Sequence, residues 1–417
     1  GMAGMLGGIL ICLVITTASV AGAMMLLEAK LAYPAAHTFG DLGLQVMGRP
    51  GEIWGNIIQL GNFCLFMPCA LQFCALALEN IGNGIPGFNG CSDYYVFVIA
   101  TVCLISTQVR TFSNTKILSL LSIICVFAMI IIMIVAAYQY EKKDKVEARW
   151  FGNPVDGTNG IVQFAGGFTI NAWAYVPAFL TVELSTCMDT PKDFQKSLVF
   201  SGVVNILVFV VLGLFVVSRW GYDVGEVIGI TQGVDAWKAG VAINTVFNVF
   251  QLTGNFVSYM LDSVPLARYC QKVWDPEFKD TWSAPDVFRY LAYTLPTFLF
   301  AFVLSIVVPS VNVLLDFTTA FTTPWVTQIY PAVLYWKLRR NSSRSLLNDG
   351  FQPSTESSVE GKLSTTEWLV IASVFLVGCI NFVLCVTKAL GFVIIGDLRP
   401  PMQIGCGSWE IWSSPPR

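Results

Sequence analysis

Polar side chains recur at helical spacing along the otherwise apolar segment 241–266. The intervals between them alternate between four and three residues, so all of them fall on one face of a helix. They are Asn244, Asn248, Gln251, Asn255, Ser258 and Asp262. Such amide, hydroxyl and carboxyl groups hydrogen-bond a polar solute or coordinate a cation, and helix packing alone does not need so long a stripe. We predict that this face borders a water-filled path and that Asn248, Gln251 and Asn255 contact a solute.

A shorter polar face lies in the segment 54–78. Asn56, Gln59 and Asn62 are three residues apart and therefore share one side of a helix. Polar groups at membrane depth are costly, which makes each a candidate for solute binding. Interhelical hydrogen bonds, worth about 0.6 kcal/mol each, explain the same residues equally well. Gln59 and Asn62 are our candidate substrate ligands on this face.

The segment 162–184 contains residues that a spanning helix disfavours. Gly166 and Gly167 each cost about 1 kcal/mol relative to alanine in a helix interior, and Pro177 removes a helical hydrogen bond. Irregular backbone at membrane depth survives only where protein or a polar cavity satisfies it. We predict an interrupted helix between residues 169 and 175 whose exposed main-chain groups bind a solute; a kinked packing helix is the alternative. The candidate ligands there are Thr169, Ile170, Asn171, Ala172 and Trp173.

The composition indicates that membrane-spanning helices position these groups. The chain of 417 residues is 55% hydrophobic and 12% charged, whereas soluble chains average about 25% charged residues. Apolar runs long enough for a spanning helix recur throughout, and we predict an all-α multi-pass membrane protein with about ten spans. The spans are expected near residues 5–27, 54–78, 94–110, 115–139, 162–184, 197–217, 241–266, 288–308, 311–336 and 366–390.

Charged residues and cysteines restrict the topology and the function. Most of the 24 Lys and Arg residues fall on the inner side if the first span begins outside, which the positive-inside rule favours. The Ser-rich segment 338–362 is then a flexible cytosolic linker, and Cys91 and Cys406 are candidates for an outer disulfide. The net charge of −3 without a basic block argues against nucleic acid as a partner. The single histidine, His37, argues against a metal site and against histidine-dependent catalysis.

Three longer stretches carry a family pattern. In residues 31–51, LAYPAAHTFGDLGLQVMGRPG, a Tyr-Pro pair precedes an aromatic-Gly-acidic-x-Gly run. Residues 162–198 combine the disrupted span with an exit of the form E…M…P-K-x-F, and residues 288–338 form two consecutive apolar spans. In order and spacing, these stretches resemble the cytosolic linker, the broken helix and the ninth and tenth helices of the amino acid/auxin permease family. That family is a branch of the amino acid–polyamine–organocation superfamily.

The resemblance implies a LeuT-like fold of eleven helices, of which the first ten form two inverted five-helix repeats with broken first helices. The broken span is the fifth here, so we expect one more helix before Gly1. Glu183 matches the acidic position of the exit motif and is a candidate gate or proton-linked carboxylate, besides capping or snorkelling roles. Sodium-dependent relatives place hydroxyls of the 241–266 helix in an ion site. The candidate ion-coupling residues are therefore Thr253, Ser258, Asp262 and Glu183, with Asp316 and Thr322 as weaker candidates.

The predicted function is secondary active transport of amino acids by alternating access, coupled to H⁺ or Na⁺ and without a resident cofactor. Its partners are the amino acid substrate and the lipid bilayer, in a plasma, vacuolar or lysosomal membrane. An amino-acid sensor on the same fold would use the same residues without flux. An integral membrane enzyme is a weaker alternative, because the sequence has neither an H-E-x-x-H nor a G-x-S-x-G motif.

Overall fold

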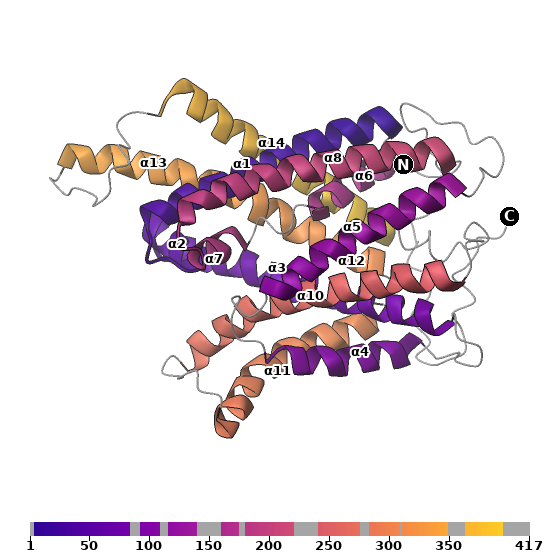
Figure 1. Ribbon diagram of the computed structural model, residues 1–417. Helices are drawn as coiled ribbons and strands as arrows, with labels where there is room; N and C mark the ends of the chain where they lie inside the picture. The colour runs from indigo at the N-terminus through magenta and orange to yellow at the C-terminus, as the bar shows by residue number, and fades with distance from the viewer. Residues whose placement is uncertain are drawn as a thin grey trace.

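In the computed structural model, the chain is all-helical wherever the structure describes it (Figure 1). The described residues are 4–83, 92–108, 116–139, 160–174, 180–220, 241–275, 283–308, 311–348 and 363–394. Within these ranges no β-strand occurs. The prediction of an all-α architecture is therefore confirmed for this part of the chain.

Within the described ranges, six helices are long and apolar enough to cross a membrane. They are α1 (Gly4–Ala32), α3 (Arg49–Asn83), α5 (Lys116–Gln139), α8 (Phe194–Trp220), α11 (Ala284–Val307) and α14 (Thr365–Ile394). The others are α2 (Phe39–Met47), α4 (Ser92–Ser106), α6 (Gly160–Ala174), α7 (Thr181–Thr186), η3 (Pro191–Asp193), α10 (Val241–Trp274), α12 (Val311–Phe321), the π-helical turn η4 (Trp325–Ile329) and α13 (Tyr330–Asn348). With 34 residues α10 is long enough to span, but its polar stripe makes it less apolar than the six.

Helix α3 lies at the centre of the bundle and packs against α2, α4, α10, α11 and α12. Its side chains Phe63, Met67 and Leu71 share a buried core with Tyr259 of α10 and Tyr330 of α13. By contrast, only 11% and 6% of the apolar stretches of α5 and α8 are buried inside the protein. These two helices form one side of the bundle in Figure 1 and expose the apolar surface that a lipid-facing helix needs.

The short helix α2 is fixed across one end of the bundle, near α7 at the left of Figure 1. A Cβ atom added to Gly43 of α2 would lie 2.2 Å from the carbonyl oxygen of Gly51 in α3, so only glycine allows this approach. The Tyr330 hydroxyl donates a hydrogen bond to the carbonyl oxygen of Phe39 at 3.0 Å. The stretch expected only as a cytosolic linker thus contains a tightly packed helix.

The structure corrects the position of the predicted helix break. Helix α6 runs without interruption to Ala174, so the prediction that the irregular segment begins at Thr169 is wrong. A second helix, α7, begins at Thr181. Tyr175 and Pro177 lie outside the described residues. The main-chain groups of residues 169–174 are therefore part of a helix, and only the carbonyl groups of its last turn lie beyond the reach of the helical hydrogen bonds that the structure describes.

Two further boundaries differ from the sequence predictions. The span expected over residues 311–336 is divided into α12, η4 and α13, with Pro324 directly before the π-helical turn. The segment predicted as a linker from residue 338 is helical to Asn348, because α13 continues beyond the apolar stretch. Residues 349–362 lie outside the described part, as do Cys91, Cys406 and the segments 140–159 and 221–240.

Candidate functional site

Gln59 connects three elements at the end of the bundle where α2 lies. Its side chain is buried, and its Nε2 donates to Oε1 of Glu183 in α7 at 2.5 Å. Its Oε1 accepts the main-chain N–H of Phe39, the first residue of α2, at 3.3 Å. The sequence singled out Gln59 and Glu183 separately, and the structure brings them into direct contact across 124 positions of chain. This hydrogen-bonded group ties α2, α3 and α7 together.

Glu183 retains an unused acceptor inside this group. The residue is 8% exposed, and its Oε2 atom is buried without a hydrogen-bond partner among the described residues. The nearby Lys30 side chain points elsewhere, donating to the carbonyl oxygens of Pro34 and Ala36. An ionised carboxylate with one unpaired oxygen is costly to bury, whereas a protonated one is less so. The site is therefore suited to binding and releasing a proton.

One turn deeper on the same face, Asn62 is fully buried against α12. Its Oδ1 accepts a hydrogen bond from the Thr322 hydroxyl at 2.6 Å. Its Nδ2 donor has no partner among the described residues. A buried donor without an acceptor costs about 1–3 kcal/mol. Asn62 therefore offers a hydrogen bond that an incoming acceptor, such as a carboxylate or a water molecule, would satisfy.

Two more unpaired hydroxyls lie at the end of α12, from Thr319 within the helix and Thr323 just after it. Thr319 and Thr323 stand one turn apart and are 0% and 1% exposed, and neither Oγ1 has a partner in the described part of the chain. Sequence reasoning weighed Thr322 but missed these two residues. The signal available was the threonine pattern of DFTTAFTTP directly before a proline, which places hydroxyls at a helix end inside an apolar span.

Some polar side chains of the α10 stripe pair with other side chains, and others leave polar atoms without a partner among the described residues. Asn248 is fully buried and is paired with its own neighbour Asn244 and with Asn80 of α3, whose Nδ2 donates to Asn248 Oδ1 at 3.2 Å. Asn248 therefore forms an interhelical packing contact, whereas the sequence analysis predicts that it contacts a solute. Gln251 is 8% exposed. Asp262 is 4% exposed, and its Oδ2 has no partner among the described residues.

The other candidates on α10 bond to their own helix. The Thr253 hydroxyl donates to the carbonyl oxygen of Val249 at 2.8 Å, Asn255 Nδ2 to that of Gln251 at 2.9 Å, and Ser258 to that of Gly254 at 3.2 Å. Such back-bonding satisfies a side chain in the absence of another partner. Their oxygen atoms still have lone pairs for a further donor or a cation.

The five candidates on α6 point in different directions. Thr169 and Ala172 are buried, and Thr169 donates to the carbonyl oxygen of Ala165 at 3.3 Å. Asn171 is partly buried and donates to its own helix. Trp173 stacks on Phe66 of α3 with a centroid distance of 4.5 Å. Ile170 is 49% exposed, so the structure places it apart from the buried members of this group.

An ion pair lies outside the membrane-spanning helices, on the surface of α2. Lys272 Nζ donates to Asp41 Oδ1 at 3.0 Å, and the main-chain N–H of His37 donates to Asp41 Oδ2 at 3.1 Å. Burial alone raises the pKa of Asp41, but these bonds and the Lys272 charge outweigh it and lower the pKa below its usual value. The pair connects α2 with the end of α10.

The chain is similar to known transporters over most of its length. The family model described as transmembrane amino acid transporter protein matches residues 2–353. The chain therefore belongs to the transmembrane amino acid transporter family. It is also 24% identical over 348 residues to the N amino acid transport system protein of Neurospora crassa, an alignment that covers 81% of this chain and 69% of that protein.

Proposed function

We propose that this protein is a secondary active transporter that carries amino acids across a membrane by alternating access, coupled to H⁺ or Na⁺. Membership of the family and the apolar helices support the general assignment. In this proposal α4, the pair α6–α7, α10 and the series α12–α13 cross the membrane in addition to the six apolar helices. That arrangement would be a LeuT-like inverted repeat.

The observation that carries the proposal is the buried, unpaired donor of Asn62. A residue used only for packing would pair its donor, as Asn248 does with Asn244. The hydroxyls of Thr319 in α12 and of Thr323 just after it have no partner among the described residues either. An amino acid has a carboxylate that accepts hydrogen bonds and an ammonium group that donates them. Asn62 would donate to the carboxylate, and the α10 face with Gln251 would supply acceptors for the ammonium group.

Glu183 gives the proposal a coupling step. Its hydrogen bond to Gln59 ties α7 to α3 and, through Phe39, to α2, and in this proposal that contact closes this end of the bundle. Protonation of the buried carboxyl would remove the cost of an unpaired charge and stabilise the closed arrangement. Release of the proton would favour exposure of Glu183 to water and movement of α7 away from Gln59. Proton release and opening of this end would then be one event.

Uptake of labelled neutral amino acids into liposomes containing the full-length protein tests the proposal. We expect saturable uptake that exceeds that of empty liposomes and that depends on an imposed pH or Na⁺ gradient. Binding of amino acid without uptake under either gradient would identify a sensor instead. Absence of both binding and uptake, with correctly folded protein, would contradict the proposal.

A further inference from the structure

A groove on the surface between α13 and α14 is not used by the transport site. It has a volume of about 220 Å³ and is lined only by apolar side chains. The lining residues are Ala332, Val333 and Trp336 of α13 with Trp368, Ile371, Ala372 and Phe375 of α14. Trp368 and Phe375 are 53% and 40% exposed, so the groove opens outward rather than into the bundle.

The groove runs from the polar end of the two helices toward the middle of the membrane. Trp336 and Trp368 lie toward its polar end, and Phe375 lies two turns further along α14, about 10 Å away at 1.5 Å per residue. Tryptophan is enriched where a membrane protein meets the lipid headgroups. The groove therefore has the direction and depth of the outer part of a lipid acyl chain.

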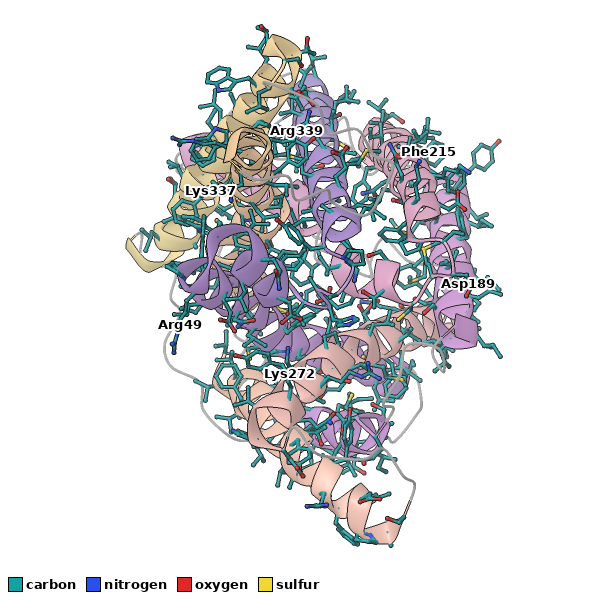
Figure 2. All side chains as sticks on the ribbon, turned by 90° about the vertical axis from the view of Figure 1, so that its left-hand side faces the viewer. Arg49, Asp189, Phe215, Lys272, Lys337 and Arg339 are labelled. Atoms are coloured by element: carbon teal, nitrogen blue, oxygen red, sulfur yellow. The ribbon has the colours of Figure 1, made fainter. Side chains whose placement is uncertain are left out.

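Positive charge surrounds the polar end of this groove. The exposed Arg340 guanidinium lies 5.4 Å from the centre of the Trp336 ring, which holds the cation beside the opening. Lys337 is next to Trp336 on the same helix. Neither Lys337 nor Arg340 forms an ion pair with a residue that the structure describes. Figure 2, which looks onto this end of the molecule, shows Lys337 there together with Arg49 and Lys272.

In the described part of the chain, the acidic residue beside Trp368 is already neutralised. Glu367, next to Trp368, pairs with Arg339 and accepts the main-chain N–H of Ser364 at 3.0 Å. Two cations without acidic partners thus remain beside an apolar groove. This combination fits a ligand with a negatively charged head and an apolar tail, whereas a zwitterionic lipid would bring its own cation next to Lys337 and Arg340.

We propose that α13 and α14 bind one anionic phospholipid of the cytosolic leaflet. Its phosphate contacts Lys337 and Arg340, and the first part of one acyl chain fills the groove between Trp336 and Phe375. The orientation follows from the excess of Lys and Arg at this end, which the positive-inside rule assigns to the cytosol. Because α13 continues directly from η4 and α12, the bound lipid would contact the same helical series that contains Thr322.

The test uses the full-length protein in phosphatidylcholine vesicles that contain a small fraction of phosphatidylserine. Either lipid carries bromine on its acyl chain, which quenches nearby tryptophan fluorescence. We expect brominated phosphatidylserine to quench more than brominated phosphatidylcholine at equal mole fraction and to saturate. Each juxtamembrane cation contributes about a fivefold preference for anionic lipid. The double variant Lys337→Gln/Arg340→Gln should therefore lose most of the excess quenching.

Two more variants separate the groove from general attraction to the surface. Ala372→Leu fills the groove and should abolish the excess. Gly213→Leu adds one carbon more on α8, where nothing lies within 4 Å of an added Cβ, and should keep the excess. Arg49→Gln removes a cation from the same end outside the groove and should keep the preference. Equal quenching of the wild-type protein by the two lipids would overturn the proposal without any variant. Excess quenching by brominated phosphatidylserine that persists in Ala372→Leu would also overturn the proposal. So would a loss of this excess in Arg49→Gln as large as the loss in the double variant.

Discussion

Successive turns of α3 use their amide side chains in different ways. Toward α2, Asn56 packs so closely that a Cβ on Gly40 would lie 2.1 Å from its Oδ1, and Gln59 uses both ends of its amide, on Phe39 and Glu183. One turn deeper, Asn62 uses only its Oδ1, and its donor is buried without a partner. The same residue class at the same spacing thus has two roles.

We interpret this difference as one between a structural polar contact and a site prepared for a ligand. The paired Gln59 amide ties α2 and α7 to α3, and the close approach of Asn56 to Gly40 leaves little room between α2 and α3. An unpaired buried donor has the opposite property, because an incoming acceptor recovers its desolvation cost. The predictions below test whether this division of α3 into a fixed end and a binding centre is correct.

The largest effect is expected for Asn62→Ala. A hydrogen bond to a charged group is worth about 1.5–3 kcal/mol, so loss of the donor to the substrate carboxylate should lower kcat/KM for uptake about 10- to 100-fold. Stability should fall by only about 1 kcal/mol, because Oδ1 loses the hydrogen bond that it accepts from Thr322, whereas the Nδ2 donor has no partner to lose among the described residues. Initial uptake rates over a range of substrate concentrations give this ratio.

Asn80→Ala is the matched control for Asn62. Asn80 lies on the same helix but is paired with Asn248 across the helix interface. Its replacement should reduce stability by about 0.6 kcal/mol and leave kcat/KM near the wild-type value. If Asn80→Ala impairs uptake as strongly as Asn62→Ala, the division between packing and binding amides is wrong.

Glu183→Gln should uncouple transport from the proton gradient. The amide oxygen can still accept the hydrogen bond from Gln59, so α7 should stay in place, but the side chain can no longer carry a proton. We expect pH-driven accumulation to disappear while exchange of internal for external substrate continues. Glu52→Gln, on the same helix as Gln59, is the control and should keep accumulation. Unchanged accumulation in Glu183→Gln would exclude this carboxyl as the coupling group.

The sequence was sufficient for the helices but not for their partners. Apolar runs indicated where the long helices lie, because burial in lipid requires continuous apolar surface, but α10 and α13 continue well past the predicted ends at residues 266 and 336. The pairing of Asn248 with Asn80, 168 positions away, depends on which helices lie side by side, and periodicity carries no such information. The same limit applied to Gln59 and Glu183. The break in α6 was misplaced because Gly166 and Gly167 lower helix stability without preventing a helix that has packing partners.

Gly43→Ala should weaken the fixed end of α3. The added methyl would lie 2.2 Å from the carbonyl oxygen of Gly51 and 2.5 Å from the Tyr330 hydroxyl, so α2 must move. Overpacking of this kind costs about 1–3 kcal/mol, measurable as a lower unfolding temperature in detergent. Gly8→Ala, where an added Cβ meets nothing within 4 Å, should have no comparable effect. Equal melting temperatures for the two variants would show that α2 is loosely held.

Ser258→Ala tests the α10 stripe with a smaller expected effect. In the described part of the chain, its hydroxyl donates to the carbonyl oxygen of Gly254 in its own helix, so stability should hardly change. If Ser258 also coordinates the coupling ion or faces the solute path, uptake should fall while insertion into the membrane stays normal. Asn255→Ala should behave alike. A loss of folded protein in proportion to activity would instead assign the stripe to packing.

The smallest effect is expected at the ion pair that attaches α2 to α10. The Lys272 side chain is 65% exposed, so Lys272→Gln should lower stability by no more than about 1 kcal/mol at neutral pH. The pKa of Asp41 is lowered in the folded protein, so its stabilising contribution is present above the ordinary aspartate pKa of about 3.9 and is lost as the pH falls through the folded value. The difference in melting temperature between the wild-type protein and Lys272→Gln should therefore shrink on acidification below about pH 4.

Arg49→Gln removes the same charge from the same end, where no described residue pairs with it, and its effect should not follow the titration of Asp41. A Lys272→Gln difference that stays constant down to pH 3 would show that the pair does not hold α2 in place, because protonation of Asp41 would then have removed nothing.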